Sequence, residues 1–308
     1  MPAIGLGTWK AKNKEVKEAV ITAIKAGYRH IDCAEIYGNE AAIGEAITQC
    51  ISEGIVTRKE LWITSKLWNN AHKREDVAPA IDQTLKNLQL EYLDLYLMHW
   101  PVAFKPEVRN AEKANDYLTL NEVPLEETWA AMLEIKKAGK ARNLGVSNFS
   151  MRKLGTLIMS NLELPEMNQV ELHPFLQQEN LLKYCKDKDI HLTAYSPLGS
   201  GDRSEGMKAE DEPNLLENDT IQEIASALDV TAGQVLIAYH LHRDTAVIPK
   251  STNEDHIKEN LAAAHITFSN EQLDKLRALD RHYRYVTGKF FEIPGNGYDN
   301  IYDEVLAQ

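Results

Sequence analysis

The chain has 308 residues and a formal net charge of −12 at neutral pH, without any block of basic residues. This charge balance argues against nucleic acid and anionic membrane as partners, and no signal peptide or apolar run of about 18 residues suggests a membrane protein. Its three cysteines lack both the pairing of a disulfide framework and the spacing of a zinc site, so we expect a reduced, cytoplasmic protein.

Short apolar runs typical of buried strands alternate eight times with amphipathic patterns typical of helices. The predicted strands are residues 4–9, 29–34, 61–67, 93–100, 141–148, 167–174, 191–198 and 245–250. The predicted helices are residues 14–26, 39–53, 74–88, 124–138, 151–160, 179–188, 220–243, with a break near Val230, and 253–264. This pattern over one chain favours an α/β fold, a single (β/α)8 TIM barrel forming one domain over residues 1–308.

An open doubly wound sheet is the main competitor, but its dinucleotide-binding fingerprint is incomplete. The stretch from Gly5 to Lys10 supplies two glycines and no third. Two segments remain outside the repeats: a long loop, residues 101–123, after the fourth strand, and residues 269–308, with a helix at 270–279 followed by a tail. We expect both near the active face as pocket walls; the alternative is that the tail only covers apolar barrel surface.

Four ionisable side chains stand at or just after the ends of the second to fourth predicted strands. They are Asp32, Tyr37, Lys66 and His99. Because barrel strands end at one common face, these groups should meet in one cleft. An ammonium beside a phenol lowers the phenol pKa, and a carboxylate holds the ammonium in place. The phenol could then give a proton to a carbonyl oxygen that a histidine orients.

These four groups supply a proton but no reductant. The strand ends show no serine nucleophile, no paired catalytic carboxylates and no metal-ligand spacing, so we expect no metal and a cofactor that brings a hydride. Taken singly, each residue has an ordinary interpretation. His99 could be a buried structural histidine, Tyr37 a surface aromatic and Lys66 one half of a structural ion pair.

Several spaced motifs resemble the aldo-keto reductases, in order and over essentially the whole chain. They are GYRHIDCAEIYGNE, ITSKLW, DLYLMHWP, GVSNF, NQVELHP, AYSPLG and IPKS. The resemblance implies a β/α barrel that binds NADPH and reduces aldehydes and ketones. Asp32, Tyr37, Lys66 and His99 match the family's catalytic tetrad, with Tyr37 as the general acid. A histidine at position 99, where some relatives have glutamate, favours carbonyl reduction over reduction of steroid double bonds.

The resemblance also implies a cofactor site. Ser147, Asn148 and Gln169 match residues that hydrogen-bond the nicotinamide carboxamide, and Tyr195 matches the aromatic that stacks on its ring. The other implied cofactor contacts are Thr8 and Trp9, a pyrophosphate loop with Ser196, Leu198 and Ser200, a 2′-phosphate site with Lys250, Ser251 and Thr252, and Glu259 and Asn260 near the adenine. Trp9, Trp68, Trp100 and Phe104 would line an aromatic substrate pocket.

The chain departs from the family pattern in three places. His256 stands where relatives usually place an arginine on the 2′-phosphate, so phosphate binding should be weaker and NADH is a weaker alternative cofactor. The sequence begins at Met1 without the hairpin strand that closes the barrel bottom in relatives, so we expect either a shortened chain or a barrel bottom that is closed differently. The tail differs from that of mammalian aldose reductases and is similar to NADP-dependent alcohol dehydrogenases of microbes or invertebrates.

Two other functions remain open at this point. A barrel lysine can form a Schiff base, which would make the protein a class I aldolase acting through Lys66. The family also includes lens crystallins and potassium-channel subunits, so a non-catalytic protein that binds the cofactor is the second alternative. We expect a monomer whose partner is a small-molecule carbonyl substrate.

Overall fold

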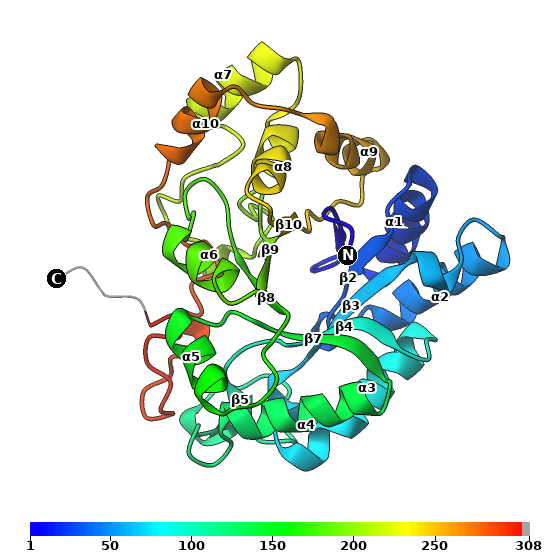
Figure 1. Cartoon of the computed structure of the whole chain (residues 1–308), viewed down its shortest axis with the longest axis vertical. Coiled ribbons are helices and arrows are strands. Elements are labelled where there is room, and N and C mark those ends of the chain that lie inside the picture. Colours follow the sequence, from blue (N-terminus) through cyan, green and yellow to red (C-terminus); the bar gives the residue numbers. More distant parts are fainter. Residues whose placement is uncertain (304–308) are drawn as a thin grey trace.

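The computed structural model describes residues 1–303 and shows one barrel of parallel strands (Figure 1). In spatial order the strands are β1 (Leu6–Gly7), β2 (His30–Asp32), β3 (Trp62–Leu67), β4 (Leu93–Met98), β7 (Ala141–Ser147), β8 (Met167–Glu171), β9 (His191–Tyr195) and β10 (Ala246–Val247). Parallel bridges from Ile4 to Val247 and from Gly7 to Lys250 join the first and last strands. The predicted (β/α)8 barrel is confirmed; residues 304–308 of the predicted domain and tail lie outside the described residues.

Helices surround the strands on all sides (Figure 1). They are α1 (Asn13–Ala26), α2 (Glu40–Ser52), α3 (Arg74–Leu88), α4 (Leu125–Lys137), α5 (Met151–Met159), α6 (Glu179–Lys186), α7 (Asp219–Leu228), α8 (Ala232–His242), α9 (Glu254–Ala262) and α10 (Asn270–Arg277). The predicted break near Val230 is confirmed, and it divides residues 220–243 into two helices. Asp229 takes a left-handed conformation with φ of 53°, and Thr231 then caps α8 through the backbone N–H of Gln234, so the chain turns by 90°.

The predicted strands are too long, mostly at their carboxyl ends. The first and last predicted strands, 4–9 and 245–250, shrink to two residues each. β7 and β9 end where Asn148 and Ser196 adopt left-handed backbone angles, with φ of 63° and 49°. Such residues turn the chain away from the ladder and toward the barrel mouth. The side chains that follow each strand are therefore placed by turns, which apolar periodicity does not reveal.

The strand register separates an apolar layer from a polar layer inside the barrel. Lys66 pairs with Leu97, Leu97 with Gly145, and Gly145 with Met167, so these residues share the inner face. Leu97 and Met167 form a buried apolar cluster there. A Cβ on Gly145 would approach Met167 O at 2.5 Å, so only glycine fits this layer. Two residues further along β7 and β8, polar side chains replace apolar ones at the mouth.

The segments outside the repeats pack against each other. Residues 101–123 contain an antiparallel pair that the sequence did not predict, β5 (Ala103–Phe104) and β6 (Tyr117–Leu118). The hydroxyl of Tyr298, from the tail, accepts a hydrogen bond from the N–H of Ala103 at 2.9 Å and donates one to the carbonyl of Leu118 at 2.6 Å. The loop and the tail therefore form one continuous wall.

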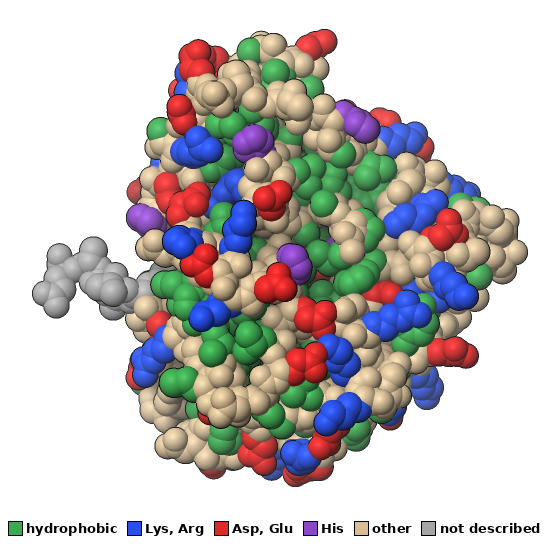
Figure 2. All heavy atoms as spheres, viewed as in Figure 1, with side chains coloured by type: hydrophobic (Ala, Val, Ile, Leu, Met, Phe, Trp, Pro, Cys, Tyr) green, Lys and Arg blue, Asp and Glu red, His purple; other side chains and the backbone are tan. Residues whose placement is uncertain are grey.

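Acidic and basic side chains are intermingled on the face shown in Figure 2. Within residues 1–303, no single helix has the length and apolar composition needed to cross a membrane. Among the helices of the described residues, α7 and α8 taken together, bent at their junction, reach that length and composition.

Candidate active site

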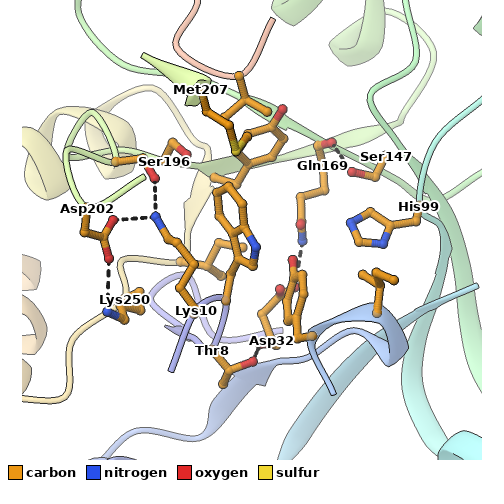
Figure 3. A pocket seen from close by; sticks show the side chains of 18 of the residues that line it. Thr8, Lys10, Asp32, His99, Ser147, Gln169, Ser196, Asp202, Met207 and Lys250 are labelled. Carbon is orange, nitrogen blue, oxygen red and sulfur yellow. Dashed lines mark hydrogen bonds and ion pairs between the residues drawn. The ribbon is translucent and has the colours of Figure 1, made fainter. Parts of the chain in front are cut away.

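A cavity of about 880 Å³ opens at the carboxyl ends of the strands (Figure 3). Aromatic side chains and three of the predicted proton-transfer groups, Asp32, Tyr37 and His99, line one end, and lysines, serines and the first turn of α9 line the other. Of the predicted site residues, those that line the cavity are Thr8, Trp9, Asp32, Tyr37, Trp68, His99, Trp100, Phe104, Ser147, Asn148, Gln169, Tyr195, Ser196, Leu198, Ser200, Lys250, Ser251, Thr252 and His256.

Lys66 lies beneath the cavity floor and is completely buried. Its ammonium forms an ion pair with Asp32 Oδ1 and donates to the carbonyl of Cys33 at 2.8 Å. Burial lowers the pKa of Lys66, but the charge of Asp32 and the nearby Tyr37 outweigh it, so the pKa is raised overall. Lys66 is therefore a charged group held in place by Asp32, as the sequence predicted.

Tyr37 ends a short 3₁₀ turn, Glu35–Tyr37, which stops where Gly38 adopts φ of 69°. Its ring centroid lies 5.3 Å from Lys66 Nζ. Burial raises the pKa of Tyr37 to about 12, and the positive charge of Lys66 only partly opposes this effect. Lys66 lowers this pKa, as predicted, but desolvation of the phenolate dominates, so the pKa is raised overall. The phenol is protonated at neutral pH and can donate.

His99 follows β4 and faces Tyr37 across the cavity. Their ring centroids are 5.9 Å apart, and the Trp68 ring lies edge-on to His99 at 5.2 Å. Burial, together with the charges of Lys66 and His72, lowers the pKa of His99 well below its ordinary value. A neutral imidazole has one N–H to donate, so His99 is suited to hydrogen-bond an oxygen placed between it and Tyr37.

The four residues predicted to hold the nicotinamide lie together, but Asn148 is already bonded to protein groups. The Tyr195 hydroxyl donates to Asn148 Oδ1 at 2.7 Å, and Asn148 Nδ2 donates to His99 O at 3.0 Å and to Ser147 Oγ at 3.1 Å. Gln169 Nε2 donates to Asp32 Oδ2 at 2.7 Å (Figure 3). Asn148 thus braces Tyr195 and the backbone of His99. Ser147, whose hydroxyl donates to the carbonyl of Gln169 at 2.8 Å, and Gln169 also line the cavity.

Three charged side chains cross the other end of the cavity (Figure 3). Asp202 pairs with Lys10 and, at 3.1 Å, with Lys250. Lys10 Nζ also donates to Ser200 Oγ at 2.9 Å. Sequence reasoning missed Lys10 and Asp202. They are 192 residues apart and neither lies in a motif, so only the fold brings them together.

Two predicted cofactor residues, Glu259 and Asn260 on α9, do not line this cavity. The carbonyl of Glu259 accepts from Gln234 Nε2 at 3.0 Å, and Asn260 is buried between α9 and α8. The part of the helix that reaches the cavity is its first turn, where Asn253 caps the N–H of His256.

The predicted aromatic pocket forms at the end of the cavity near Tyr37 and His99, with walls from the loop, residues 101–123, and the tail. Phe291, from the tail, lies with its ring centroid 5.0 Å from that of Trp100 and 5.7 Å from that of Phe104. Val286, also in the tail, lines the pocket and was not singled out from the sequence, because nothing local marks it. Trp68 Nε1 donates to the carbonyl of Arg109 at 2.8 Å and so holds the loop.

Comparisons with known proteins agree with this geometry. The model of the Aldo/keto reductase family matches residues 3–281. The chain belongs to the aldo-keto reductase family. It is 47% identical over 307 residues to an aldo/keto reductase of Synechocystis, covering 99% of this chain and 94% of that relative. It is 43% identical over 291 residues to aldo-keto reductase family 1 member A1 of Homo sapiens, covering 93% of this chain and 88% of the human protein.

A solved structure of an aldo-keto reductase from Bombyx mori, in complex with NADP, superposes with a TM-score of 0.87 at 33% identity. The match covers 97% of this chain and 95% of the other. The family resemblance seen in the motifs is thereby confirmed, and it extends to the three-dimensional structure.

Proposed function

We propose that this aldo-keto reductase uses NADPH to reduce aldehydes and ketones to alcohols, with Tyr37 as the proton donor. The observation that carries the proposal is the meeting of Tyr37, the buried Lys66–Asp32 pair and neutral His99 at one end of a cavity. A carbonyl oxygen that is gaining negative charge needs a proton and a hydrogen-bond donor. These residues supply both from opposite sides.

Each group has a distinct task in the proton transfer. The Tyr37 hydroxyl gives its proton to the carbonyl oxygen, and Lys66 stabilises the phenolate that remains, since its ammonium lies 5.3 Å from the ring. Asp32 keeps Lys66 charged, and His99 donates its N–H to the same oxygen. Such a positioned acid typically contributes about 10²- to 10⁴-fold in rate.

The residues at the cavity fit NADPH. Lys10 and Lys250 supply positive charge for phosphates, with the hydroxyls of Ser251 and Thr252 beside them. Ser147 and Gln169 offer polar atoms for a carboxamide, and Tyr195 offers a flat aromatic face. When bound, NADPH supplies the hydride. The NADP in the Bombyx mori relative supports this assignment.

We infer that the substrate is a small carbonyl compound with an apolar or aromatic body. The side chains lining the substrate end are mostly aromatic, and Asn110 is the polar side chain of the loop among them. Arg109, also on the loop, is paired with Glu35 outside this lining. A pocket of this kind favours apolar surface over charge. We also propose that the protein acts as a cytoplasmic monomer without nucleic acid or membrane partners.

The structure disfavours the aldolase alternative. A lysine must be neutral to attack a carbonyl and must reach it. Lys66 is buried, its pKa is raised, and it does not line the cavity. The non-catalytic alternative would require that the proton-transfer groups serve no purpose.

The test is to mix the protein with NADPH and a reactive aromatic aldehyde and follow NADPH oxidation together with alcohol formation. We expect one alcohol for each NADPH oxidised. NADPH binding without turnover over a broad aldehyde and ketone panel would support the non-catalytic alternative. Covalent trapping of substrate on Lys66 by borohydride would support the aldolase. Light scattering of the purified protein decides whether it is a monomer.

A further inference from the structure

Glu171, the last residue of β8, holds the C-terminal tail from inside the barrel. Its side chain is completely buried. Oε1 accepts the backbone N–H of Tyr285 at 2.7 Å, and Oε2 accepts that of Val286 at 2.8 Å. His173 Nε2 lies 2.8 Å from Oε1. One buried carboxylate therefore fixes two consecutive residues of the tail.

This carboxylate is ionised in the folded protein. Burial tends to raise the pKa of Glu171, but the hydrogen bond and charge of His173, the charge of Arg284 and the N–H of Tyr285 outweigh it, and the pKa is lowered. Hydrogen bonds to a charged acceptor are stronger than neutral ones. The two N–H groups of the tail thus have a strong acceptor that water cannot replace.

A second side chain holds Val286 from its other end. The hydroxyl of Tyr302 donates to the carbonyl of Val286 at 3.0 Å. The same hydroxyl lies 3.4 Å from Asn148 Oδ1 and 3.4 Å from the Tyr195 hydroxyl. Val286 is therefore held at its N–H by Glu171 and at its carbonyl by Tyr302, and Tyr302 also contacts the cluster that braces the nicotinamide site.

Val286 lines the substrate end of the cavity, so its place affects what the cavity admits. β8 carries Gln169 and Glu171 two positions apart, hence on the same face of the strand. Gln169 contacts Asp32 at the cavity floor, and Glu171 holds the tail that forms its wall. β8 therefore carries both a residue that contacts the cavity floor and a residue that holds the cavity wall.

We propose that Glu171 and Tyr302 are positioning residues that fix Val286 in the pocket wall and thereby limit the size of the carbonyl substrate. The proposal rests on the proposed function. Neither residue touches the reacting atoms. We expect them to act through Val286. Their substitution should therefore change substrate selectivity, and not only the chemical step or the stability of the fold.

Conservative substitutions test this idea. In Glu171→Gln one carboxylate oxygen becomes an amide nitrogen, which cannot accept the tail N–H it faces. Tyr302→Phe removes only a hydroxyl. Because one net hydrogen bond corresponds to roughly a 2- to 10-fold effect, we expect each variant to change the ratio of kcat/KM between a bulky aromatic aldehyde and a short aliphatic aldehyde by that factor. In Glu171→Gln the change should lie in KM for the bulky aldehyde, with kcat for the short one within about twofold of wild type.

Double mutants decide whether the effect passes through Val286. In the background of Val286→Ala, the wall side chain is already shortened, so adding Glu171→Gln or Tyr302→Phe should change the selectivity ratio little further. Additive changes would overturn the proposal. Tyr184→Phe and Glu179→Gln, on the outer helix α6, are the matched controls and should leave the ratio unchanged.

Hydrogen exchange gives a readout that does not depend on activity. The amides of Tyr285 and Val286 should exchange faster in Glu171→Gln than in Glu179→Gln. Unchanged exchange, or faster exchange without any change in selectivity, would overturn the proposal. If the wild-type protein reduces no carbonyl compound, the proposed function fails. The selectivity ratio then no longer serves as the test of Glu171 and Tyr302. The exchange rates still decide whether Glu171 holds the tail.

Discussion

Asp32 links Lys66 to Gln169 inside the barrel. One carboxylate oxygen pairs with the Lys66 ammonium and the other accepts a hydrogen bond from Gln169 Nε2 at 2.7 Å. Lys66 and Asp32 are 0% and 2% exposed, so water does not compete for either charge. Removing one partner would leave a buried charge without compensation. Asp32 therefore connects Lys66, the charged neighbour of the proton donor Tyr37, to Gln169 of the proposed nicotinamide site.

The first prediction concerns Tyr37. Tyr37→Phe should keep NADPH binding but reduce kcat for aldehyde reduction by at least about a hundredfold, because it deletes only the proton donor. NADPH affinity is measured by quenching of tryptophan fluorescence and kcat in steady state. A near-normal kcat in this variant would remove Tyr37 from its assigned role.

The second prediction concerns Lys66 and Tyr37 as a pair. Lys66→Met should reduce kcat nearly as much as Tyr37→Phe, and the double mutant should be little worse than either, because the ammonium acts by stabilising the phenolate. Circular dichroism and NADPH affinity serve as controls for folding, since Asp32 loses its buried partner. If the two losses multiply, the residues work independently.

Sequence reasoning was most successful where local pattern and chemistry coincide. Asp32 and Lys66 end or lie within apolar strands, and a charged group there has to meet a partner, which the ion pair confirms. Their distance from the cavity was not predictable, and Lys66 lies below its floor. The eightfold alternation predicted the barrel for the same reason, since buried strands and amphipathic helices differ in period.

The missed features depend on contacts between distant segments. Asp202 meets Lys10 and Lys250 only after the barrel closes. Glu171 lies in a recognised motif, but its partners are backbone N–H groups of the tail, which carry no sequence signature. The net direction of the Tyr37 pKa was not predictable, because the sequence shows the charge of Lys66, which lowers this pKa, and not the desolvation that outweighs it.

That pKa leads to the third prediction. A general acid is active while protonated, so reduction should be lost only as pH rises through the pKa of Tyr37, about 12. The kcat for reduction should therefore show no decline attributable to Tyr37 between about pH 7 and 9, where a phenol with its pKa lowered below about 10 would already begin to lose its proton. The measurement is kcat against pH at saturating substrate and NADPH. If the wild-type kcat falls within this range while the residual kcat of Tyr37→Phe does not, the effect of Lys66 on the pKa of Tyr37 outweighs the effect of burial.

The fourth prediction concerns His256 at the phosphate end of the cavity. It lines the cavity beside Lys250, Ser251 and Thr252, in the first turn of α9. We expect a modest preference for NADPH over NADH, because an imidazole lacks the fork of donors and the permanent charge of an arginine, while NADH has no 2′-phosphate to bind. The dissociation constants of both cofactors, measured by quenching of tryptophan fluorescence, test this.

His256→Arg provides the matched comparison for that prediction. Arginine is charged at every working pH and offers a fork of donors, so it should tighten NADPH selectively by about 1–2 kcal/mol, the scale of a charge-assisted hydrogen bond. NADH binding should change little. His265, exposed on the 3₁₀ turn after α9, supplies the control His265→Arg, which adds the same charge away from the cavity lining. Equal tightening in both variants would mean that only net charge matters. An unchanged NADPH constant in His256→Arg would mean that the 2′-phosphate lies elsewhere along the cavity.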